Sequence, residues 1–196
     1  MRLEFWFEFG STYSYPAAMR IEHLAGAHNV ELLWKPFLLG PIFNNQGWND
    51  SPFNTHHAKG KYMWRDMERI CEAESIPLKK PSVFPRNGLL ASRIACTYAA
   101  EKWIPDFIRS VYSANFAMDL DISDSKVIKS CIPSVAGCKD TVVDQALTPS
   151  AKERLRNNTD RAQLNGIFGA PSFVVGEELF WGNDRLESAI EWAQNV

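Results

Sequence analysis

The feature that most constrains this chain is a predicted strand near its N-terminus that passes through a short polar turn into a helix. Apolar and polar residues alternate from Leu3 to Phe9, as in a β-strand with one strongly apolar face. Gly10 ends this strand. Apolar residues then recur at helical spacing from Ala17 to Ala25, and Pro16 fits only the first turn of that helix, where no intrahelical N–H partner is lost. The sequence therefore predicts a strand–turn–helix unit.

Ser11 and Thr12 lie where the predicted helix begins. Backbone N–H groups at a helix start have no intrahelical acceptor, and the helix dipole adds partial positive charge there. Such a place attracts an anion. The simpler alternative is that one of the two hydroxyls only caps the helix.

Length and composition narrow the function classes. A chain of 196 residues favours one core that carries a large insertion. With 45% hydrophobic and 22% charged residues the composition is globular, and a net charge of −2 with scattered Lys and Arg offers nucleic acid no basic surface. Glu4 and Glu8 interrupt the apolar start, and no apolar run reaches the length of a membrane span, so we expect a cytoplasmic protein without a membrane partner.

The four cysteines do not form a recognisable site. Cys71, Cys96, Cys131 and Cys138 include no C-x-x-C pair, and no histidine stands at metal-ligand spacing from them. Cys71 and Cys96 fall within helical patterns. We therefore expect reduced core cysteines, no metal and a reducing compartment.

A second strand, over residues 30–37, completes a predicted βαβ unit. A right-handed crossover makes the two strands parallel and brings Lys35, at the carboxyl end of the second strand, near the turn that carries Ser11. Lys35 is therefore a candidate cation for the anion site. A solvated strand end is the alternative reading of a lysine before a proline.

The middle of the chain reads as helical. Residues 40–55 are rich in Gly, Pro and Asn, which predicts a long loop without a regular element, and such loops are often functional. No strand signal follows before residue 165. The predicted helices cover residues 55–74, 89–102, 106–117, a short segment after Ser123 or Asp124, 141–147 and 149–165. Asn87 is placed to cap the second of them.

The last thirty or so residues return to strand character. Residues 172–175 and 178–181 predict two strands joined by a tight turn at Gly176-Glu177, and Asn183 or Asp184 is expected to cap a final helix, with Glu187 completing a capping box. The fold class is therefore α/β, a βαβ…ββα sheet interrupted by a large all-helical insertion. We assign residues 1–54 and 166–196 to the sheet domain and 55–165 to the insertion.

This order resembles the thioredoxin-like arrangement, in which a proline just before the third strand faces the start of the first helix. The segment Gly169-Ala170-Pro171-Ser172 resembles that loop. Thioredoxin-like oxidoreductases carry C-x-x-C at the helix start, whereas this chain has Ser11-Thr12-Tyr13-Ser14. Dithiol exchange by the chain itself is excluded, because it needs a thiolate nucleophile and a second sulfur.

Six short segments, specific when taken together and in order, carry a closer resemblance along nearly the whole chain: Phe9-Gly10-Ser11-x-Tyr13-Ser14-Tyr15, Lys35-Pro36-Phe37, Tyr62-Met63-x-Arg65-Asp66-x-Glu68-Arg69, Phe84-Pro85-x-Asn87, Phe168-Gly169-Ala170-Pro171 and Phe180-Trp181-Gly182-Asn183-Asp184-Arg185-Leu186. In these the chain resembles 2-hydroxychromene-2-carboxylate isomerases and, more broadly, kappa-class glutathione transferases. Thr12 stands where that family commonly has proline.

The resemblance implies glutathione as cofactor and assigns roles to residues of this chain. Ser11 would be the catalytic residue and hold the glutathione sulfur as thiolate. The backbone of Ala170, before a cis Pro171, would pair with the cysteinyl backbone of glutathione. The γ-glutamyl end would meet Trp181, Gly182, Asn183 and Asp184, with Asp184 at its ammonium group. The candidates for contact with an anionic aromatic carboxylate substrate are Lys35, Asn44, Asn45, Arg86 and Asn87.

The implied reaction is the isomerisation of 2-hydroxychromene-2-carboxylate, or a close aromatic analogue, to trans-o-hydroxybenzylidenepyruvate. It proceeds by glutathione thiolate addition, ring opening, bond rotation and elimination, as a step of aromatic catabolism. Two alternatives stay open: a kappa-type transferase or peroxidase acting on other electrophiles, and a non-catalytic glutathione-binding module. The resemblance also implies a homodimer.

Overall fold

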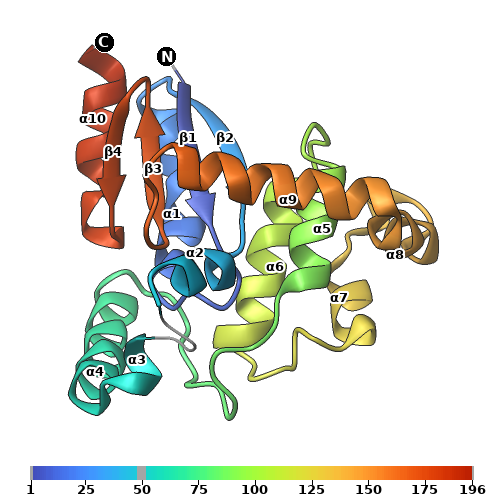
Figure 1. Ribbon diagram of the computed structural model, residues 1–196, viewed down its shortest axis with the longest axis horizontal. Helices are drawn as coiled ribbons and strands as arrows, with labels where there is room; N and C mark the ends of the chain where they lie inside the picture. Colours follow the sequence, from blue (N-terminus) through green and yellow to red (C-terminus); the bar gives the residue numbers. More distant parts are fainter. Residues whose placement is uncertain (1, 48–51, 196) are drawn as a thin grey trace.

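One mixed sheet of four strands organises the molecule, seen in the computed structural model of Figure 1. The strand order is β2-β1-β3-β4, in which β1 and β2 run parallel and β3 runs antiparallel to both β1 and β4. The structure describes residues 2–47 and 52–195. Its elements are β1 (Arg2–Phe7), α1 (Ser14–Ala27), β2 (Glu31–Pro36), α2 (Leu39–Asn45), α3 (Pro52–Thr55), α4 (His57–Ala73), α5 (Leu89–Thr97), α6 (Ile104–Phe116), α7 (Ser125–Cys131), η1 (Ser134–Ala136), α8 (Lys139–Leu147), α9 (Pro149–Leu164), β3 (Ser172–Val175), β4 (Glu178–Trp181), η2 (Asn183–Arg185) and α10 (Leu186–Asn195).

Strand β1 is buried on both of its faces. Phe5 and Phe7 belong to the main apolar cluster, which also holds Ile21 of α1 and Ile190 of α10. Trp6, on the opposite face, is also fully buried and forms a second cluster with Phe37 and Val174, under α2 and α9. The prediction of a single apolar face was therefore incomplete, because helices cover both sides of the sheet.

Helix α1 begins as the sequence predicts. Pro16 lies in its first turn, and Ala17, Ile21 and Ala25 face the core. After the helix, Asn29 adopts a left-handed conformation with φ of 56°, which reverses the chain into β2. The crossover places the end of β2 beside the end of β1, as expected for a parallel pair.

Helices occupy the chain between the two halves of the sheet, and several begin at the predicted residues. The Asn87 carboxamide accepts the Leu89 amide at the start of α5, and Asp124 accepts the Lys126 amide at the start of α7. Pro105 lies in the first turn of α6. These starts depend on side chains within a few residues, so the local sequence suffices to predict them.

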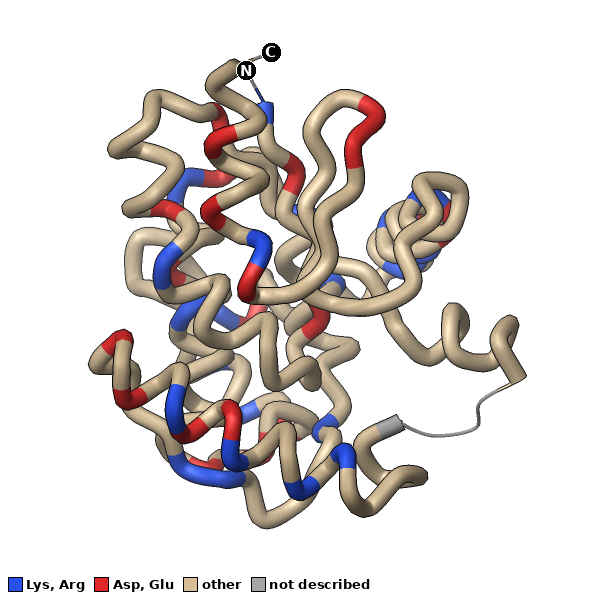
Figure 2. Tube along the Cα trace, turned by 90° about the vertical axis from the view of Figure 1, so that its left-hand side faces the viewer, with Lys and Arg blue, Asp and Glu red and all other residues tan. Residues whose placement is uncertain are grey.

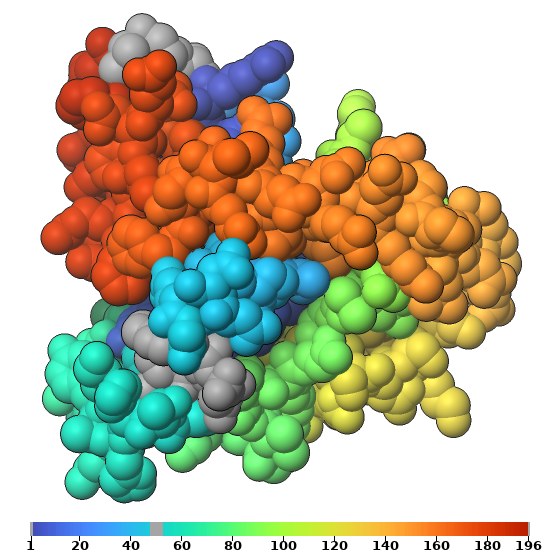
Figure 3. All heavy atoms as spheres, viewed as in Figure 1, coloured from blue at the N-terminus to red at the C-terminus, as the bar shows by residue number. Residues whose placement is uncertain are grey.

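Two expectations about loops and caps were wrong. Residues 40–55 contain α2 and α3 instead of only loop, whereas positions 48–51 lie outside the described residues. Helix α2 forms because Ile42 packs into the cluster around Trp6, and Figure 3 shows α2, in light blue, between α9 and the α3–α4 segment. The final helix starts at Leu186 after the single turn η2, and Glu187 pairs with Arg20 instead of completing a capping box.

The main apolar cluster extends from the sheet into the helical segment. Phe7 and Phe9 pack against Tyr112 of α6 with tilted rings, and Tyr15 of α1 stacks with Phe116. The division into residues 1–54 with 166–196 and residues 55–165 stays a prediction. In Figure 2 positive and negative residues are interspersed along the chain. Within the described ranges, no helix is both long and apolar enough to cross a membrane.

Candidate active site

A cavity of about 1090 Å³ lies at the carboxyl end of β1. It is bounded by the turn after β1, by α2, by the α3–α4 segment, by the loop at residues 84–86 and by the loops that precede β3 and follow β4. Pockets for drug-sized ligands measure roughly 300–1000 Å³, so this cavity has room for more than one small molecule.

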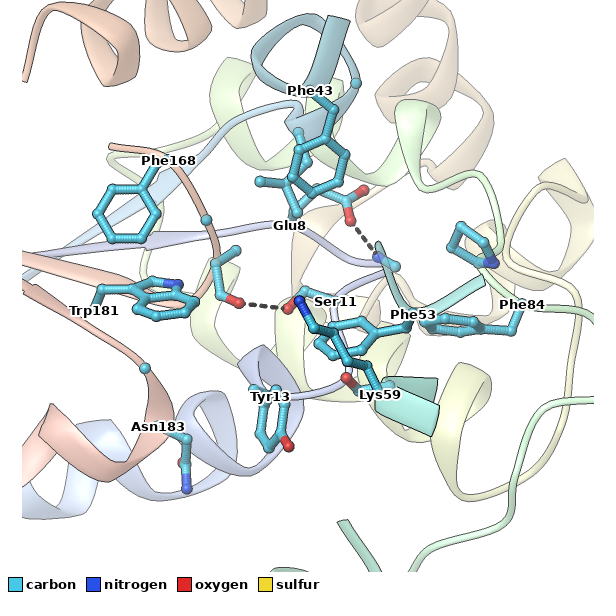
Figure 4. A pocket seen from close by; sticks show the side chains of 18 of the residues that line it. Glu8, Ser11, Tyr13, Phe43, Phe53, Lys59, Phe84, Phe168, Trp181 and Asn183 are labelled. Atoms are coloured by element: carbon cyan, nitrogen blue, oxygen red, sulfur yellow. Dashed lines mark hydrogen bonds between the residues drawn. The ribbon is translucent and has the colours of Figure 1, made fainter. Parts of the chain in front are cut away.

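Ser11 lies where the turn after β1 meets the loop before β3. Its hydroxyl donates to the carbonyl oxygen of Ala170 at 2.9 Å, shown as a dashed line in Figure 4, and its Oγ accepts the Ser14 amide at 3.3 Å. The Ala170–Pro171 bond is cis. Ser11 thus links the start of α1 to the proline loop.

Thr12 serves packing. Its side chain is 1% exposed, and its hydroxyl contacts the Met63 sulfur at 3.0 Å. Of the two hydroxyls at the helix start, the partly exposed one belongs to Ser11. Ser14, at the position of the second cysteine in C-x-x-C, is fully buried.

The residues expected at the γ-glutamyl end lie together in the cavity wall. Trp181, Gly182, Asn183 and Asp184 all line it, whereas Pro171 does not. Glycine is required at 182, because φ is +109° and an added Cβ would stand 2.5 Å from the Asp184 Oδ1. The carboxylate of Asp184 therefore lies close against this turn.

The loop before β3 packs equally closely against the Trp181 indole. An added Cβ at Gly169 would stand 2.4 Å from the Trp181 Nε1, so the indole lies directly over the backbone of this glycine. The Phe168 ring packs against the same indole at a tilted angle, with ring centroids 4.8 Å apart. These contacts fix one wall of the cavity.

The residues expected on the substrate side divide into two groups. Asn44 and Arg86 line the cavity, and Lys35, Asn45 and Asn87 do not. Lys35 lies instead near Cys96, whose pKa it lowers against the larger effect of burial. Asn45 bonds to Gln163 at 3.1 Å, while Asn87 holds the Leu89 amide. Neighbouring side chains at the end of a strand or helix can point toward the cavity or away from it, and their spacing in the sequence does not show which of them line it.

The Arg86 guanidinium is engaged with the protein itself. It pairs with Asp119 and bonds to the Asn115 carboxamide at 3.2 Å. The Ser82 amide, and after it Arg86, lower the pKa of Asp119 to about 2. Arg86 therefore positions the loop that closes one side of the cavity.

Several lining residues were missed by sequence reasoning. Lys59 of α4 extends toward the Ser11 side of the cavity in Figure 4, and the phenylalanines labelled there at positions 43, 53, 84 and 168 line it as well. The sequence gives no signal that would distinguish a lysine facing a cavity from the solvent-exposed lysines on the same helix. The glycine- and asparagine-rich stretch, expected to be functional, does supply Phe43 and Asn44.

Glu8 is a further lining residue that the sequence reading did not select. Its side chain is only partly exposed, and its Oε2 accepts the Gly10 amide at 2.9 Å. Burial raises the pKa of the Glu8 carboxyl to about 7, although the backbone amides of Gly10 and Ser11 lower it. Across the cavity the Tyr13 hydroxyl donates to Asp66 at 3.0 Å.

Comparison with known proteins shows a likeness along the whole chain. Residues 2–190 match the family described as DSBA-like thioredoxin domain. A 2-hydroxychromene-2-carboxylate isomerase of Sphingobium xenophagum is 27% identical over 187 residues, 94% of each chain, and the Homo sapiens glutathione S-transferase kappa 1 is 22% identical over 199 residues, 94% of this chain and 87% of that one. A solved 2-hydroxychromene-2-carboxylate isomerase superposes with a TM-score of 0.85 at 23% identity, covering 100% of this chain and 95% of its own.

Proposed function

The chain belongs to the family of DSBA-like thioredoxin domains, and from that premise we propose that it is a glutathione-dependent enzyme that isomerises 2-hydroxychromene-2-carboxylate or a close aromatic analogue. The observation that carries this proposal is the Ser11 hydroxyl, which lies 2.9 Å from the carbonyl before the cis Pro171 and accepts the Ser14 amide at the start of α1. A hydroxyl there can donate to a bound thiolate but cannot exchange a disulfide. The isomerase of Sphingobium xenophagum, 27% identical over 94% of each chain, supports the same assignment.

The polar groups around Ser11 fit glutathione. In the structure the Ala170 carbonyl accepts the Ser11 hydroxyl. When that hydroxyl turns to donate to a sulfur, the carbonyl can accept the cysteinyl N–H of the tripeptide instead. Asp184 supplies a carboxylate for the γ-glutamyl ammonium. The turn at Gly182, where an added Cβ would clash, places this carboxylate in the cavity wall.

Glutathione, when bound, supplies a thiolate that adds reversibly to a conjugated double bond and so permits rotation about it. The task of the protein is to keep the sulfur ionised, since a thiol of pKa about 8.5 is only a few per cent thiolate at neutral pH. A hydrogen bond from Ser11 to the charged sulfur contributes about 1.5–3 kcal/mol, and the start of α1 about 0.3–1 kcal/mol. The Ser11 hydroxyl is therefore the larger contribution.

The opposite wall fits an aromatic carboxylate. Phenylalanines at 43, 53, 84 and 168 offer apolar surface to an aromatic ring. Among the described lining cations, Arg86 pairs with Asp119 and Arg185 with Asp184, whereas Lys59 has no ion pair with any described residue. We therefore assign the substrate carboxylate to Lys59 in place of Lys35, with Asn44 beside it.

A kappa-type transferase that acts on other electrophiles is the second candidate. The human kappa relative, at 22% identity over 94% of this chain, favours it. Both reactions would use the same thiolate site. They differ in the fate of glutathione, because isomerisation returns it and transfer consumes it. By family resemblance we also propose a homodimer that acts in aromatic catabolism in the cytosol, where the glutathione pool is reduced.

The test is the ultraviolet spectrum of 2-hydroxychromene-2-carboxylate mixed with the protein, with and without glutathione, together with a count of free thiol. We expect conversion to the benzylidenepyruvate only with glutathione and no loss of thiol. Loss of thiol on electrophiles without isomerisation would favour the transferase. Binding of glutathione without turnover of either kind would contradict both and leave a binding module.

A further inference from the structure

Glu8 places a carboxyl group in the cavity wall for which the chemistry at Ser11 has no use. It follows β1 and precedes Ser11 by three residues, so both side chains belong to the same short turn. Both line the cavity, as Figure 4 shows. A carboxyl group with limited solvent contact costs free energy unless it has a hydrogen-bonding or ionic partner, and groups that keep such a cost are often functional.

The position of this carboxyl is fixed by the backbone. Its Oε2 accepts the Gly10 amide at 2.9 Å. An added Cβ at Gly10 would stand 3.0 Å from that oxygen and 3.0 Å from the Arg86 carbonyl oxygen, so glycine is what allows the carboxyl to fold over the turn. The Tyr112 hydroxyl donates to the Glu8 carbonyl at 3.0 Å and holds the strand end from the side of α6. Oε2 is thus engaged, and Oε1 is the oxygen left to act on a bound molecule.

No cation of the described residues pairs with Glu8. Arg86 faces the same turn, but its guanidinium bonds to Asp119 and Asn115. The Tyr112 hydroxyl contacts the backbone of Glu8 from α6. The other titratable groups among the described lining residues are Tyr13, Lys59, Asp66, Asp184 and Arg185. Because burial raises the pKa of Glu8 to about 7, its acid and base forms coexist near neutral pH, as suits a group that both takes and returns a proton.

We propose that Glu8 is a catalytic residue that transfers the proton needed to open the substrate ring. This inference rests on the proposed function. In 2-hydroxychromene-2-carboxylate, carbon 2 carries both the hydroxyl and the ring oxygen and is therefore a cyclic hemiketal. Glu8 takes the hydroxyl proton, the bond from carbon 2 to the ring oxygen breaks with its electron pair going to that oxygen, and carbon 2 becomes a ketone. The protonated Glu8 then returns the proton to the phenolate.

Ring opening leaves every atom in the substrate and requires no thiol. It can therefore be observed without glutathione, apart from the rotation that the thiolate permits. The substrate interconverts with its open cis ketone in solution, and magnetisation-transfer NMR measures the exchange rate between the two forms. A catalytic amount of the protein should raise this rate in the absence of glutathione.

The experiment compares wild type, Glu8→Gln and Glu4→Gln. Glu4 lies in β1, four residues before Glu8 and outside the cavity, so it controls for loss of one carboxylate from this segment. We expect Glu8→Gln to lower the protein-dependent exchange rate roughly a hundredfold, as for loss of a general acid–base, and Glu4→Gln to leave it near wild type. Glu8→Asp should restore part of the rate.

A Glu8→Gln protein that opens the ring as fast as wild type would overturn the inference, as would a wild type that does not accelerate exchange at all. If Glu8→Gln does not fold, the pH dependence of the ring-opening exchange rate in the presence of wild-type protein tests the inference instead. A protein-dependent rate that rises through neutral pH supports Glu8, and a flat one contradicts it. Failure of the proposed function would be seen in a different measurement. The trans isomer would then not form in the presence of glutathione, whatever the rate of ring opening.

Discussion

The proposed chemistry of this cavity depends on two side chains in one turn, Glu8 and Ser11. The proposal gives them separate tasks because their environments differ. The Ser11 hydroxyl donates to the Ala170 carbonyl and accepts the Ser14 amide at the start of α1, and by turning from that carbonyl it can donate to an anion. The Glu8 carboxyl is desolvated, which favours its protonated form.

The raised pKa of Glu8 predicts a pH dependence of stability. The unfolded carboxyl ionises near 4.5 and the folded one near 7, so across this interval the folded state holds a proton that the unfolded state has lost. The free energy of unfolding therefore falls as pH rises through the interval, by at most about 3 kcal/mol, and less insofar as the cavity solvates the carboxyl. Urea unfolding between about pH 4 and about pH 8 measures it.

Glu8→Gln is the matched control for this effect, because it does not titrate. The difference in the free energy of unfolding between Glu8→Gln and wild type should grow with pH across the interval. A constant difference would show that the Glu8 carboxyl has the same pKa in the folded and unfolded states.

Positions in the cavity could be predicted where short distinctive segments carry the family resemblance. That resemblance names Ser11, Ala170 and Asp184, and the structure brings all three to one cavity, while their roles stay proposals. The prediction for Lys35 depended on strand order alone, and its side chain lies near Cys96 and does not line the cavity. Side-chain direction at a strand end depends on tertiary packing, which one sequence does not reveal.

At the scale of elements, the cavity is completed by helices outside the sheet. Helix α4 contributes Lys59 and Asp66, and α2 contributes Phe43 and Asn44. The sheet, its parallel pair and its hairpin could be predicted because alternation and turn residues are short-range signals. Helix α2 could not be predicted, because Gly40 and Pro41 are typical of a loop. The helix depends on the packing of Ile42 into a buried cluster, which is a tertiary contact.

Helix α4 offers a direct test of the substrate wall. Lys59→Met should raise the KM for the aromatic carboxylate roughly fivefold to tenfold, about 1–1.4 kcal/mol, because a partly exposed ion pair is lost. Lys61→Met is the control: Lys61 is exposed on the same helix, outside the cavity lining, and methionine has a helix propensity similar to that of lysine. Steady-state kinetics at saturating glutathione measures both. Equal KM values for the two variants would remove Lys59 from the substrate site.

At the scale of the whole molecule, reactive sulfur is separated from the cavity. Cys71 and Cys96 are buried in the core, and burial raises their pKa values to about 11 and about 12. Cys138 is exposed before α8, where hydrogen bonds from Thr141 and the Asp140 amide lower its pKa. None of these three lines the cavity.

Thiol alkylation should therefore modify Cys138 first and leave turnover unchanged. Peptide mass spectrometry after addition of one equivalent of iodoacetamide identifies the modified residue, and Cys138→Ser should abolish this early reaction. Rapid inactivation of a protein that is still folded would mean that one of its own thiols, and not glutathione, is the nucleophile.

The central claim is that the Ser11 hydroxyl ionises the thiol of glutathione. The direct measurement is the pKa of bound glutathione, followed by the ultraviolet absorbance of its thiolate during a pH titration of wild type and Ser11→Ala. The wild-type complex should titrate about one to two pH units below Ser11→Ala, matching a lost charge-assisted hydrogen bond of about 1.5–3 kcal/mol. Ser11→Ala turnover should accordingly recover as pH rises above the pKa of the free thiol. The same bound thiol pKa in both proteins would contradict the mechanism, and Ser11 would then be only a cap for α1.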